Sequence, residues 1–355
     1  MGERVVVAMS GGVDSAVAAA RCVAAGDEVI GISLRLLRGA GGHCCSLDDF
    51  RDAQAVADRL GFPHYVIDAA ETFAERVVAP FVAEYLGGRT PNPCARCNEH
   101  VKFGLLWQRA RELGAARLAT GHYARIGADP ETGAPRLRMA ADTAKDQSYF
   151  LFTLREAELS RTCFPVGELT KAAVRAEAQA LGLPVAAKPE SMEVCFVPDG
   201  DAAAFVAAHA PPEDLRPGPV VDETGREVAR HEGIHRFTVG QRRGLGVAGA
   251  ARRYVTGLDA ATGTVRTGGA ASLRASGLVA HDVSWAGTKP VDGTALAVRI
   301  RHRHGLVPAR LAAAAAGSAR VVFDQVGPAV TPGQAAVFYR GDLVLGGGWI
   351  AEGLS

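Results

Sequence analysis

The sequence contains no long uninterrupted run of apolar residues. Apolar runs such as residues 5–9 and 311–316 are far shorter than the roughly 18 residues that a membrane-spanning helix needs. Residues 1–9 also lack the basic stretch, apolar stretch and cleavage site that together make a secretory signal. We therefore expect a cytoplasmic protein with no membrane partner.

The sequence also has little net charge and few lysines. The formal net charge is +1, with five lysines beside 34 arginines, and we attribute the scarcity of lysine to coding bias. The chain as a whole is not basic, so its net charge does not predict nucleic-acid binding. Two stretches are basic: residues 230–253 contain six arginines and one acid, and residues 299–310 contain four arginines and no acid. Each stretch is either an anion-binding patch or a solvated surface.

The sequence has few cysteines, and their number is odd. Seven cysteines in a 355-residue chain that we expect in the cytosol exclude a disulfide scaffold. The surroundings of Cys22 and Cys163 predict small buried hydrophobic residues, and the same interpretation holds for Cys44 and Cys45. The remaining three cysteines are candidates for catalysis or metal binding.

The first 125 residues alternate between strand and helix patterns. This rhythm predicts an α/β fold with a mostly parallel sheet that has helices on both faces. A capping box at Ser46 and Asp49 predicts the start of one helix, and Gly61 its end. We expect strands over 4–9, 28–37, 64–68 and 117–124, helices over 13–25, 46–60, 71–86, 98–113 and 170–181, and a hairpin over 125–140.

The sequence pattern changes near residue 210. From there, short apolar stretches alternate with turns rich in Gly and Pro, which predicts two small β-rich units. The alanine-rich residues 311–316 favour a helix by propensity. Because residues 299–303 and 320–324 have strand patterns, we expect 311–316 to be a strand as well.

The most informative segment is the sequence Ser-Gly-Gly-Val-Asp-Ser at residues 10–15, between an expected strand and an expected helix. Glycines let the backbone approach a ligand, and the free amides at a helix N-terminus attract an anion. The segment is neither a Walker A loop nor a dinucleotide fingerprint. It resembles the pyrophosphate loop of the N-type ATP pyrophosphatases, which split ATP into AMP and pyrophosphate. An aspartate beside phosphates, Asp14, suggests a bound Mg²⁺ ion.

A second segment contains Cys94 and Cys97 between prolines and an expected helix. Its two prolines predict a loop, and the nearby helix N-terminus and Arg96 would favour the Cys97 thiolate. The pair could be half of a zinc site, but a second half is missing from the sequence. It could also be a thioredoxin-like pair, but its position does not follow a first strand. Residues 190–196, which contain Cys195, predict a turn into a short strand.

Three segments, residues 10–15, 92–98 and 194–196, together resemble the tRNA-specific 2-thiouridylases, which place sulfur on C2 of the wobble uridine. Residues 121–125, 145–150, 238–242 and 331–334 agree with that family as well. The resemblance implies a pyrophosphate-loop catalytic domain over 1–207, a central β-rich domain over 208–275 and a C-terminal β-barrel that contacts RNA over 276–355.

The resemblance also implies a mechanism. ATP adenylates the C2 oxygen of the uridine, so that AMP becomes the leaving group, and sulfur then replaces it. Cys97 corresponds to the nucleophile and Cys195 to the persulfide carrier. Cys94 stands where the family often has Asp, so Cys94, Cys97 and Cys195 could instead bind an iron–sulfur cluster. We favour the persulfide route and leave the cluster route open.

Further site residues follow from the same resemblance. The nucleotide contacts implied are Ala8, Met9, Ser10, Gly11, Gly12, Val13, Asp14, Ser15, Leu34 and Gly121. The tRNA contacts implied are Asn92, Pro93, Cys94, His122, Lys145, Asp146, Gln147, Arg301, His302 and Gln334. ATP and Mg²⁺ are the expected cofactors, with an iron–sulfur cluster as an option. The expected partners are tRNA and a sulfur-relay or cysteine desulfurase protein.

Two rival functions remain at this stage. A pyrophosphate-loop ligase would adenylate a small carbonyl compound and deliver ammonia, but it needs neither two reactive cysteines nor an RNA-facing barrel. A nucleotide-regulated RNA-binding protein would have no catalysis. Alanine at Cys97 and Cys195 separates the hypotheses, because only a sulfurtransferase would lose its product while keeping nucleotide and RNA binding.

Overall fold

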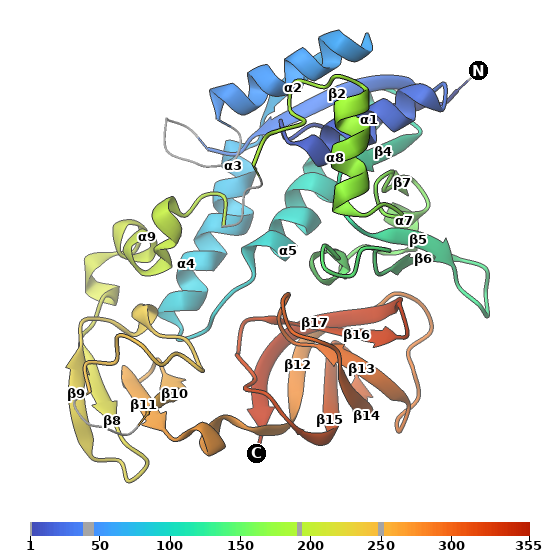
Figure 1. The fold of residues 1–355 in the computed structure, drawn as a ribbon. Coiled ribbons are helices and arrows are strands. Elements are labelled where there is room, and N and C mark those ends of the chain that lie inside the picture. Colours follow the sequence, from blue (N-terminus) through green and yellow to red (C-terminus); the bar gives the residue numbers. More distant parts are fainter. Residues whose placement is uncertain (1, 38–45, 190–193, 248–251) are drawn as a thin grey trace. The chain divides into compact units, whose positions relative to one another are not determined.

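The computed structural model describes residues 2–37, 46–189, 194–247 and 252–355 (Figure 1). The chain divides into two compact units. The first unit consists of Met1–Val77, Cys94–Gly200 and Asp342–Val344, and the second of Val78–Pro93, Asp201–Gly341 and Leu345–Ser355.

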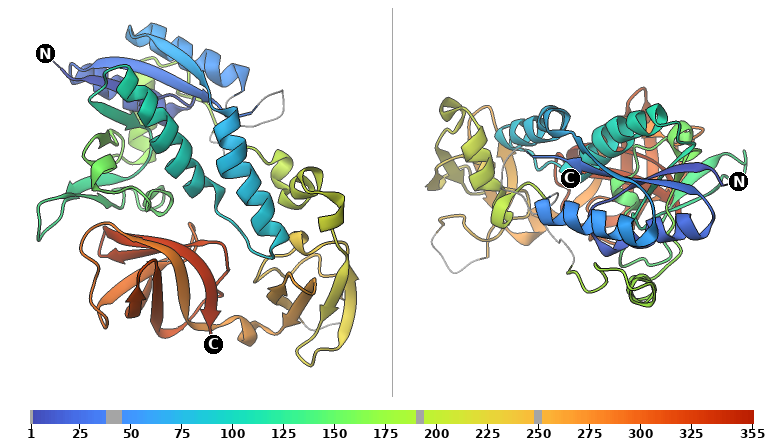
Figure 2. Two further views of the ribbon diagram at one scale, coloured as in Figure 1. Left: turned by 180° about the vertical axis from the view of Figure 1, so that it is seen from behind. Right: turned by 90° about the horizontal axis from the view of Figure 1, so that it is seen from above.

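A parallel sheet with strand order β3-β2-β1-β4-β7 forms the centre of the first unit. Its central strand is fully buried at Val5, Val6 and Val7, because helices cover both faces of the sheet (Figure 2). The α/β class predicted from the sequence is therefore confirmed. The strands are β1 (Arg4–Ala8), β2 (Glu28–Arg35), β3 (His64–Asp68), β4 (Arg117–Thr120) and β7 (Thr162–Cys163).

The helices of the first unit follow the predicted order. The capping box at Ser46 and Asp49 is present, and the helix that it starts ends at Gly61, as predicted. The helical segments up to residue 112 are α1 (Val13–Ala24), α2 (Leu47–Leu60), α3 (Ala70–Phe73), η1 (Ala74–Val78), α5 (Pro93–Cys97), η2 (Asn98–Leu105) and α6 (Leu106–Glu112). The later ones are η3 (Ser148–Phe150), α7 (Glu156–Leu159), α8 (Lys171–Ala180) and η4 (Pro198–Gly200). The predicted hairpin is also present, as β5 (Arg125–Ala128) paired with β6 (Pro135–Arg138).

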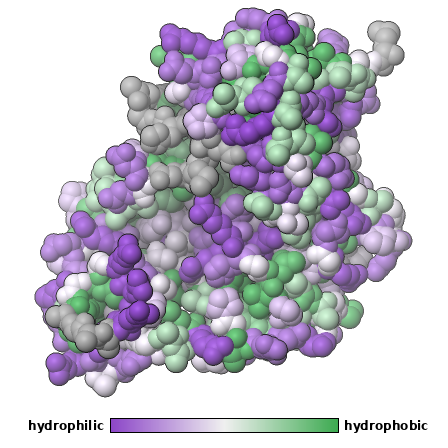
Figure 3. Space-filling model, viewed as in Figure 1, coloured by the Kyte–Doolittle hydropathy of each residue, from purple (hydrophilic) through white to green (hydrophobic). Residues whose placement is uncertain are grey.

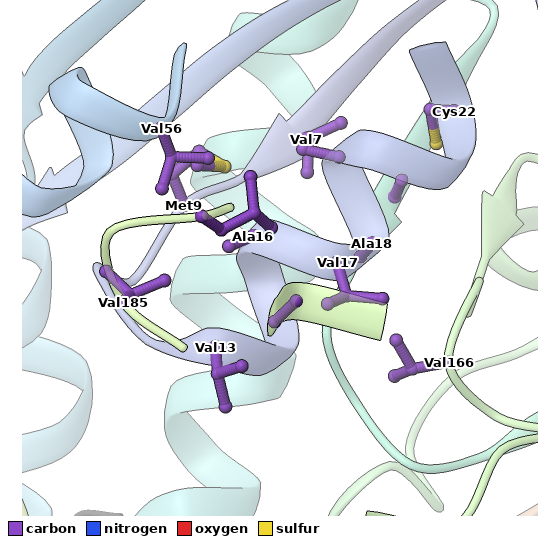
Figure 4. Close-up of a cluster of buried hydrophobic side chains, with 14 of the residues drawn as sticks. Val7, Met9, Val13, Ala16, Val17, Ala18, Cys22, Val56, Val166 and Val185 are labelled. Carbon is purple, nitrogen blue, oxygen red and sulfur yellow. The ribbon is translucent and has the colours of Figure 1, made fainter. Parts of the chain in front are cut away.

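Helix α1 packs its apolar side onto the sheet (Figure 4). Small residues such as Ala16 and Ala18 let this helix approach β1 closely, and Val56 of α2 and Val185 join the same cluster. Cys22 is buried there, as predicted, and Cys163 packs against the cluster, whereas Cys44 and Cys45 lie outside the described residues. This core fixes the turn between β1 and α1, where residues 10–15 lie.

Three local predictions are wrong. Residues 93–97 were expected in a loop, but they are helical, because Pro93 occupies the first helical turn, where a missing N–H costs nothing. Cys195 lies in a turn rather than a strand, and residues 190–193 are outside the described residues. Of residues 299–303, only Arg299 belongs to a strand.

The second unit contains a small sheet and a barrel. The sheet has the order β10-β11-β8-β9, and the barrel strands run β12-β15-β14-β13-β16-β17, with β17 pairing back to β12. Residues 311–315 lie in a barrel strand, which confirms the choice of strand over helix there. The strands are β8 (Gly218–Val221), β9 (Glu227–His231), β10 (Tyr254–Asp259), β11 (Thr264–Gly268), β12 (Ala275–Trp285), β13 (Ala295–Arg299), β14 (Val307–Ala315), β15 (Ser318–Gly327), β16 (Ala335–Arg340) and β17 (Leu343–Leu354). The helical segments are α4 (Ala79–Leu86), α9 (Ala202–His209), η5 (Pro212–Asp214), η6 (Ile234–Arg236) and η7 (Ala270–Leu273).

Hydrophilic and hydrophobic side chains are interspersed over the surface that Figure 3 shows. The most exposed large apolar side chains, Val291 and Leu47, belong to different units. Among the described helices, none has the length and apolar character required to cross a bilayer.

Candidate active site

The loop between β1 and α1 is held in shape by its own hydroxyl groups. The backbone N–H of Ser10 donates to Oγ of Ser15 at 3.2 Å, and the Ser15 hydroxyl donates to the Gly12 carbonyl at 3.0 Å. Gly11 has a φ of +70°, and a Cβ there would lie 2.4 Å from the Asp49 carbonyl oxygen. The loop therefore requires glycine at this position and presents Ser10, Ser15 and the start of α1 to a ligand.

Two lysines hold this loop from outside. The Lys188 ammonium donates to the Gly11 carbonyl at 3.0 Å and pairs with Asp49 and Asp52 on α2. Burial opposes the charge of Lys188, but the two carboxylates outweigh it and raise the pKa of the lysine. The Lys171 ammonium, at the start of α8, donates to both carboxylate oxygens of Asp14, at 2.7 and 2.9 Å.

A cavity of about 230 Å³ opens beside the loop. Apolar residues form much of its wall, which suits an adenine ring, and the polar groups are three hydroxyls, one carboxylate, one lysine, one imidazole and one amide. The residues present therefore fit ATP. The lining residues are Ala8, Met9, Ser10, Asp14, Ser15, Ile32, Leu34, Leu36, Lys102, Leu106, Thr120, Gly121, His122 and Gln147.

Most of the predicted nucleotide residues line this cavity. Gly11, Gly12 and Val13 belong to the loop but do not reach the cavity. Gly121 follows β4, and a Cβ there would lie 2.6 Å from the Asp14 carbonyl carbon and 2.6 Å from the Ser15 nitrogen. Gly121 therefore allows the end of β4 to pass directly against the loop.

His122 and Gln147, predicted as tRNA contacts, line the same cavity. Burial, and to a lesser degree the nearby Lys102 ammonium, holds the pKa of His122 well below its usual value, so the imidazole is neutral. The Lys102 ammonium donates to His122 Nε2 at 3.5 Å, so the proton of the ring lies on Nδ1, which donates to Thr120 Oγ1 at 2.8 Å. Their contact with tRNA remains a prediction.

The two cysteines of the second motif begin one long helical segment, α5–η2–α6 (Pro93–Glu112), which we call the cysteine helix. Cys94 is exposed, whereas Cys97 has 7% of its surface exposed. Lys102 and Leu106 of the same helix line the cavity, so the helix that carries Cys97 also forms part of the wall of the nucleotide pocket.

Cys195 is partly buried in the turn that follows the undescribed residues 190–193. Its neighbour Phe196 packs edge-on against Phe73 of α3, with ring centroids 5.4 Å apart. Helix α3 also contacts η2 of the cysteine helix. The segments that carry Cys97 and Cys195 thus pack on one common helix.

The other predicted tRNA contacts make protein contacts. Asp146 is buried and accepts hydrogen bonds from Ala140 and Ser148, so it shapes its own turn, while Lys145 beside it is half-buried. Arg301 donates to the Val239 carbonyl and to the Thr331 hydroxyl. Their roles in RNA binding remain predictions.

In the second unit, the Gln334 amide donates to the carbonyls of Thr90 and Pro91, at 3.0 and 3.1 Å. It thereby holds the proline-rich segment that contains the buried Asn92 and Pro93 and leads to Cys94. His302 is half-buried after β13.

Two metal sites are predicted, Mg²⁺ at Asp14 together with ATP and an iron–sulfur cluster at Cys94, Cys97 and Cys195. Asp14 is neutralised by Lys171, and no group of three or more His, Cys, Asp or Glu side chains in the described ranges could hold a metal ion. These ranges include Cys94, Cys97 and Cys195, and the iron–sulfur ligand set remains a prediction. We expect Mg²⁺ at this site only when it is coordinated by the phosphates of ATP.

Sequence reasoning missed Lys102, Lys171 and Lys188. A signal was available, because lysine is rare here and basic positions are otherwise arginine. Three of the five lysines contact or line the phosphate loop region, which points to a need for a compact ammonium group there rather than to coding bias.

Models of known protein families match three consecutive parts of the chain. Residues 3–199 match the family model described as tRNA methyl transferase HUP domain, residues 203–268 match the tRNA methyl transferase PRC-barrel domain, and residues 275–350 match the aminomethyltransferase beta-barrel domain. The expected order of a catalytic domain, a central β-rich domain and a C-terminal barrel is confirmed.

Curated relatives match over nearly the whole chain. The tRNA-specific 2-thiouridylase MnmA of Solibacter usitatus (strain Ellin6076) is 49% identical, covering 98% of this chain and 98% of the relative. The protein of the same name from Geotalea uraniireducens (strain Rf4) is 48% identical, covering 99% and 96%. A solved structure, the U34-tRNA thiolase NcsA from Methanococcus maripaludis, is 16% identical over 60% of this chain and 66% of its own, at a TM-score of 0.37, which is too slight a likeness to bear on this site. On the strength of its relatives, the chain belongs to the family of tRNA-specific 2-thiouridylases.

Proposed function

We propose that this protein is a tRNA-uridine 2-sulfurtransferase, which uses ATP to replace the C2 oxygen of the wobble uridine in tRNA with sulfur. One observation carries the proposal. The cavity beside the Ser10–Ser15 loop is lined by the same helix that begins with Cys94 and Cys97. A nucleotide pocket and a candidate sulfur nucleophile therefore belong to one element.

The first half-reaction is adenylation of the base. The C2 oxygen of uracil is a poor leaving group, and adenylation converts it into part of AMP. The loop amides at the start of α1 and the hydroxyls of Ser10 and Ser15 would hold the departing pyrophosphate, while Ile32, Leu34 and Leu36 would pack on the adenine. Mg²⁺ would enter on the ATP phosphates and neutralise part of their charge.

The second half-reaction is sulfur transfer. A Cys195 persulfide would be attacked by the Cys97 thiolate, which releases hydrosulfide and leaves a disulfide between the two cysteines. Hydrosulfide then adds to C2, AMP leaves, and the base keeps a C2–sulfur double bond. A thiol reductant must then restore both cysteines.

The remaining assignments are part of the same proposal. The domain boundaries are 1–207, 208–275 and 276–355, the compartment is the cytoplasm, and a persulfide-carrying donor protein loads Cys195. The alternative route, in which Cys94, Cys97 and Cys195 bind an iron–sulfur cluster, is kept as a competing hypothesis.

The test is a nucleoside analysis of tRNA. Unmodified tRNA, ATP, Mg²⁺ and a persulfide donor are incubated with the protein, and the digested RNA is examined by mass spectrometry for 2-thiouridine. The expected nucleotide products are AMP and pyrophosphate in equal amounts with the new nucleoside. Formation of ADP, or product from the Cys97→Ala/Cys195→Ala double variant, would contradict the proposal.

A further inference from the structure

Lys102 is a cation in the nucleotide cavity, and within the described ranges no carboxylate neutralises it. Lys171 pairs with Asp14, and Lys188 pairs with Asp49 and Asp52. Lys102 forms no ion pair with any described residue, although it is half-buried and lines the cavity together with Ser10 and Ser15. A partly buried ammonium group without a counter-ion favours binding of an anion.

The surroundings of Lys102 direct its ammonium group. It donates to Nε2 of the neutral His122, whose other nitrogen is fixed by the buried Thr120 hydroxyl. The His122 ring is flanked by Phe103 and Phe164, with centroids 6.0 and 6.2 Å away, so it has little freedom to turn. A histidine that stays neutral can accept this hydrogen bond without repelling the lysine.

The backbone at Lys102 is a π-helix, η2, rather than an α-helix. Such wide turns change the direction of side chains relative to the preceding turn and often occur at functional sites. Cys97 lies five residues earlier, which corresponds to roughly 7 Å along the axis of the cysteine helix. In the proposed reaction, the uridine base lies between the α-phosphate of ATP and the two cysteines. The phosphate nearest to the cysteine helix is therefore the α-phosphate, which is the one that reacts.

We propose that Lys102 binds the α-phosphate of ATP and stays on that phosphate in the adenylated uridine, and that His122 is the positioning residue for Lys102. This inference rests on the proposed function. In the adenylation step the C2 oxygen bonds to the α-phosphorus, the bond from phosphorus to the bridging oxygen breaks, pyrophosphate leaves with its electron pair, and the N3 proton of the base passes to solvent. Lys102 transfers no proton; it stabilises the negative charge on the non-bridging α-oxygens.

Calorimetric binding of three ligands to Lys102→Met tests the assignment without catalysis. ATP and AMP both carry the α-phosphate, whereas adenosine carries none. We expect the affinities for ATP and AMP to fall at least about tenfold, and the affinity for adenosine to change less than about twofold. Lys102→Gln, which keeps a polar but uncharged end on a side chain one bond shorter, should behave in the same way, and Lys289→Met in the barrel is the matched control.

Each other pattern overturns the assignment. If ATP binding weakens and AMP binding does not, Lys102 contacts the pyrophosphate portion. If adenosine binding weakens equally, or if no affinity changes, Lys102 has no phosphate role. None of these outcomes depends on tRNA or sulfur, so a failure to detect 2-thiouridine would contradict the proposed function separately.

His122 is tested through its acceptor nitrogen. His122→Gln can still accept from Lys102 and should keep AMP affinity within about threefold, whereas His122→Phe fills the space between Phe103 and Phe164 without an acceptor. We expect His122→Phe to lose AMP affinity in the wild-type Lys102 background and to lose nothing further when Lys102 is already Met. Additive losses in the double variant would show that His122 does not act through Lys102.

Discussion

The ammonium group of Lys171 donates to both carboxylate oxygens of Asp14, and the Tyr123 hydroxyl donates to one of them at 2.8 Å. Asp14 is the aspartate of the Ser-Gly-Gly-Val-Asp-Ser loop, which the sequence suggested as a Mg²⁺ ligand. In this structure its charge is balanced by Lys171 from the start of α8. In this protein Asp14 therefore joins the loop to α8 and to the segment after β4.

The first prediction concerns this pair. Lys171→Met should weaken binding of a non-hydrolysable ATP analogue at least about tenfold, because charge-assisted hydrogen bonds of this kind contribute about 1.5–3 kcal/mol. Asp14→Asn should have a similar effect, and the double variant should lose little more than either single variant. Binding is measured by calorimetry at several Mg²⁺ concentrations, with Lys289→Met as the control.

The dependence on Mg²⁺ distinguishes the two roles of Asp14. If Asp14 acts through Lys171, excess Mg²⁺ does not restore binding to Asp14→Asn. Restoration of wild-type affinity at high Mg²⁺, together with full activity of Lys171→Met, would return Asp14 to the role of a metal ligand.

The second prediction concerns Gly121. A methyl group at this position would meet the backbone of Asp14 and Ser15 at 2.6 Å, so Gly121→Ala must displace the phosphate loop. We expect a loss of ATP affinity of at least about tenfold and a destabilisation of about 1–3 kcal/mol, as for other overpacked sites. Gly305→Ala is the control, because no atom lies within 4 Å of a Cβ there. An unchanged affinity would mean that the loop does not need this close approach.

Patterns that repeat along the chain were enough to predict the fold. The buried strand at Val5–Val7, the helix cap at Ser46 and the alternation of strands and helices reflect local propensities that tertiary packing did not override. The prediction failed at residues 93–97, where two prolines suggested a loop. Proline also suits the first turn of a helix, and tertiary contacts such as those of Thr90 and Pro91 with Gln334, which no local pattern predicts, fix the chain before that turn.

Site residues that lie together in one short segment could be predicted from the sequence. Contacts between residues far apart in the sequence could not. Ser10–Ser15 forms its own hydrogen bonds, so its motif alone identified it. The pairing of Asp14 with Lys171 joins residues 157 apart, and no local pattern encodes such a contact. The rarity of lysine in an arginine-rich chain was the one available signal.

The third prediction separates two arginines of the basic stretch 299–310 in the barrel, Arg301 and Arg303. Arg303 is exposed, whereas Arg301 is bound to the Val239 carbonyl and to Thr331. Arg303→Glu should weaken tRNA binding and lower the slope of log affinity against log salt by about one, because one phosphate contact is lost. Arg301→Glu should mainly lower the melting temperature. The tRNA affinity of each variant is measured by filter binding over a series of salt concentrations. An unchanged slope for Arg303→Glu would mean that this part of the barrel faces solvent in the complex.

The fourth prediction separates the two routes for sulfur through Cys94. Cys94 is exposed and Cys97 is buried, although both belong to the first turns of one helix. In the persulfide route only Cys97 and Cys195 exchange sulfur, so Cys94→Ser should retain at least about half of the thiolation rate, while Cys97→Ser should retain none. In the cluster route Cys94 is a ligand, and serine replaces it poorly because the thiolate is the softer donor. Cys94→Ser would then lose both the activity and the visible absorption of the anaerobically reconstituted protein. Retained activity without any iron content would exclude the cluster route, because no electron or sulfur donor besides the two cysteines and the persulfide would remain.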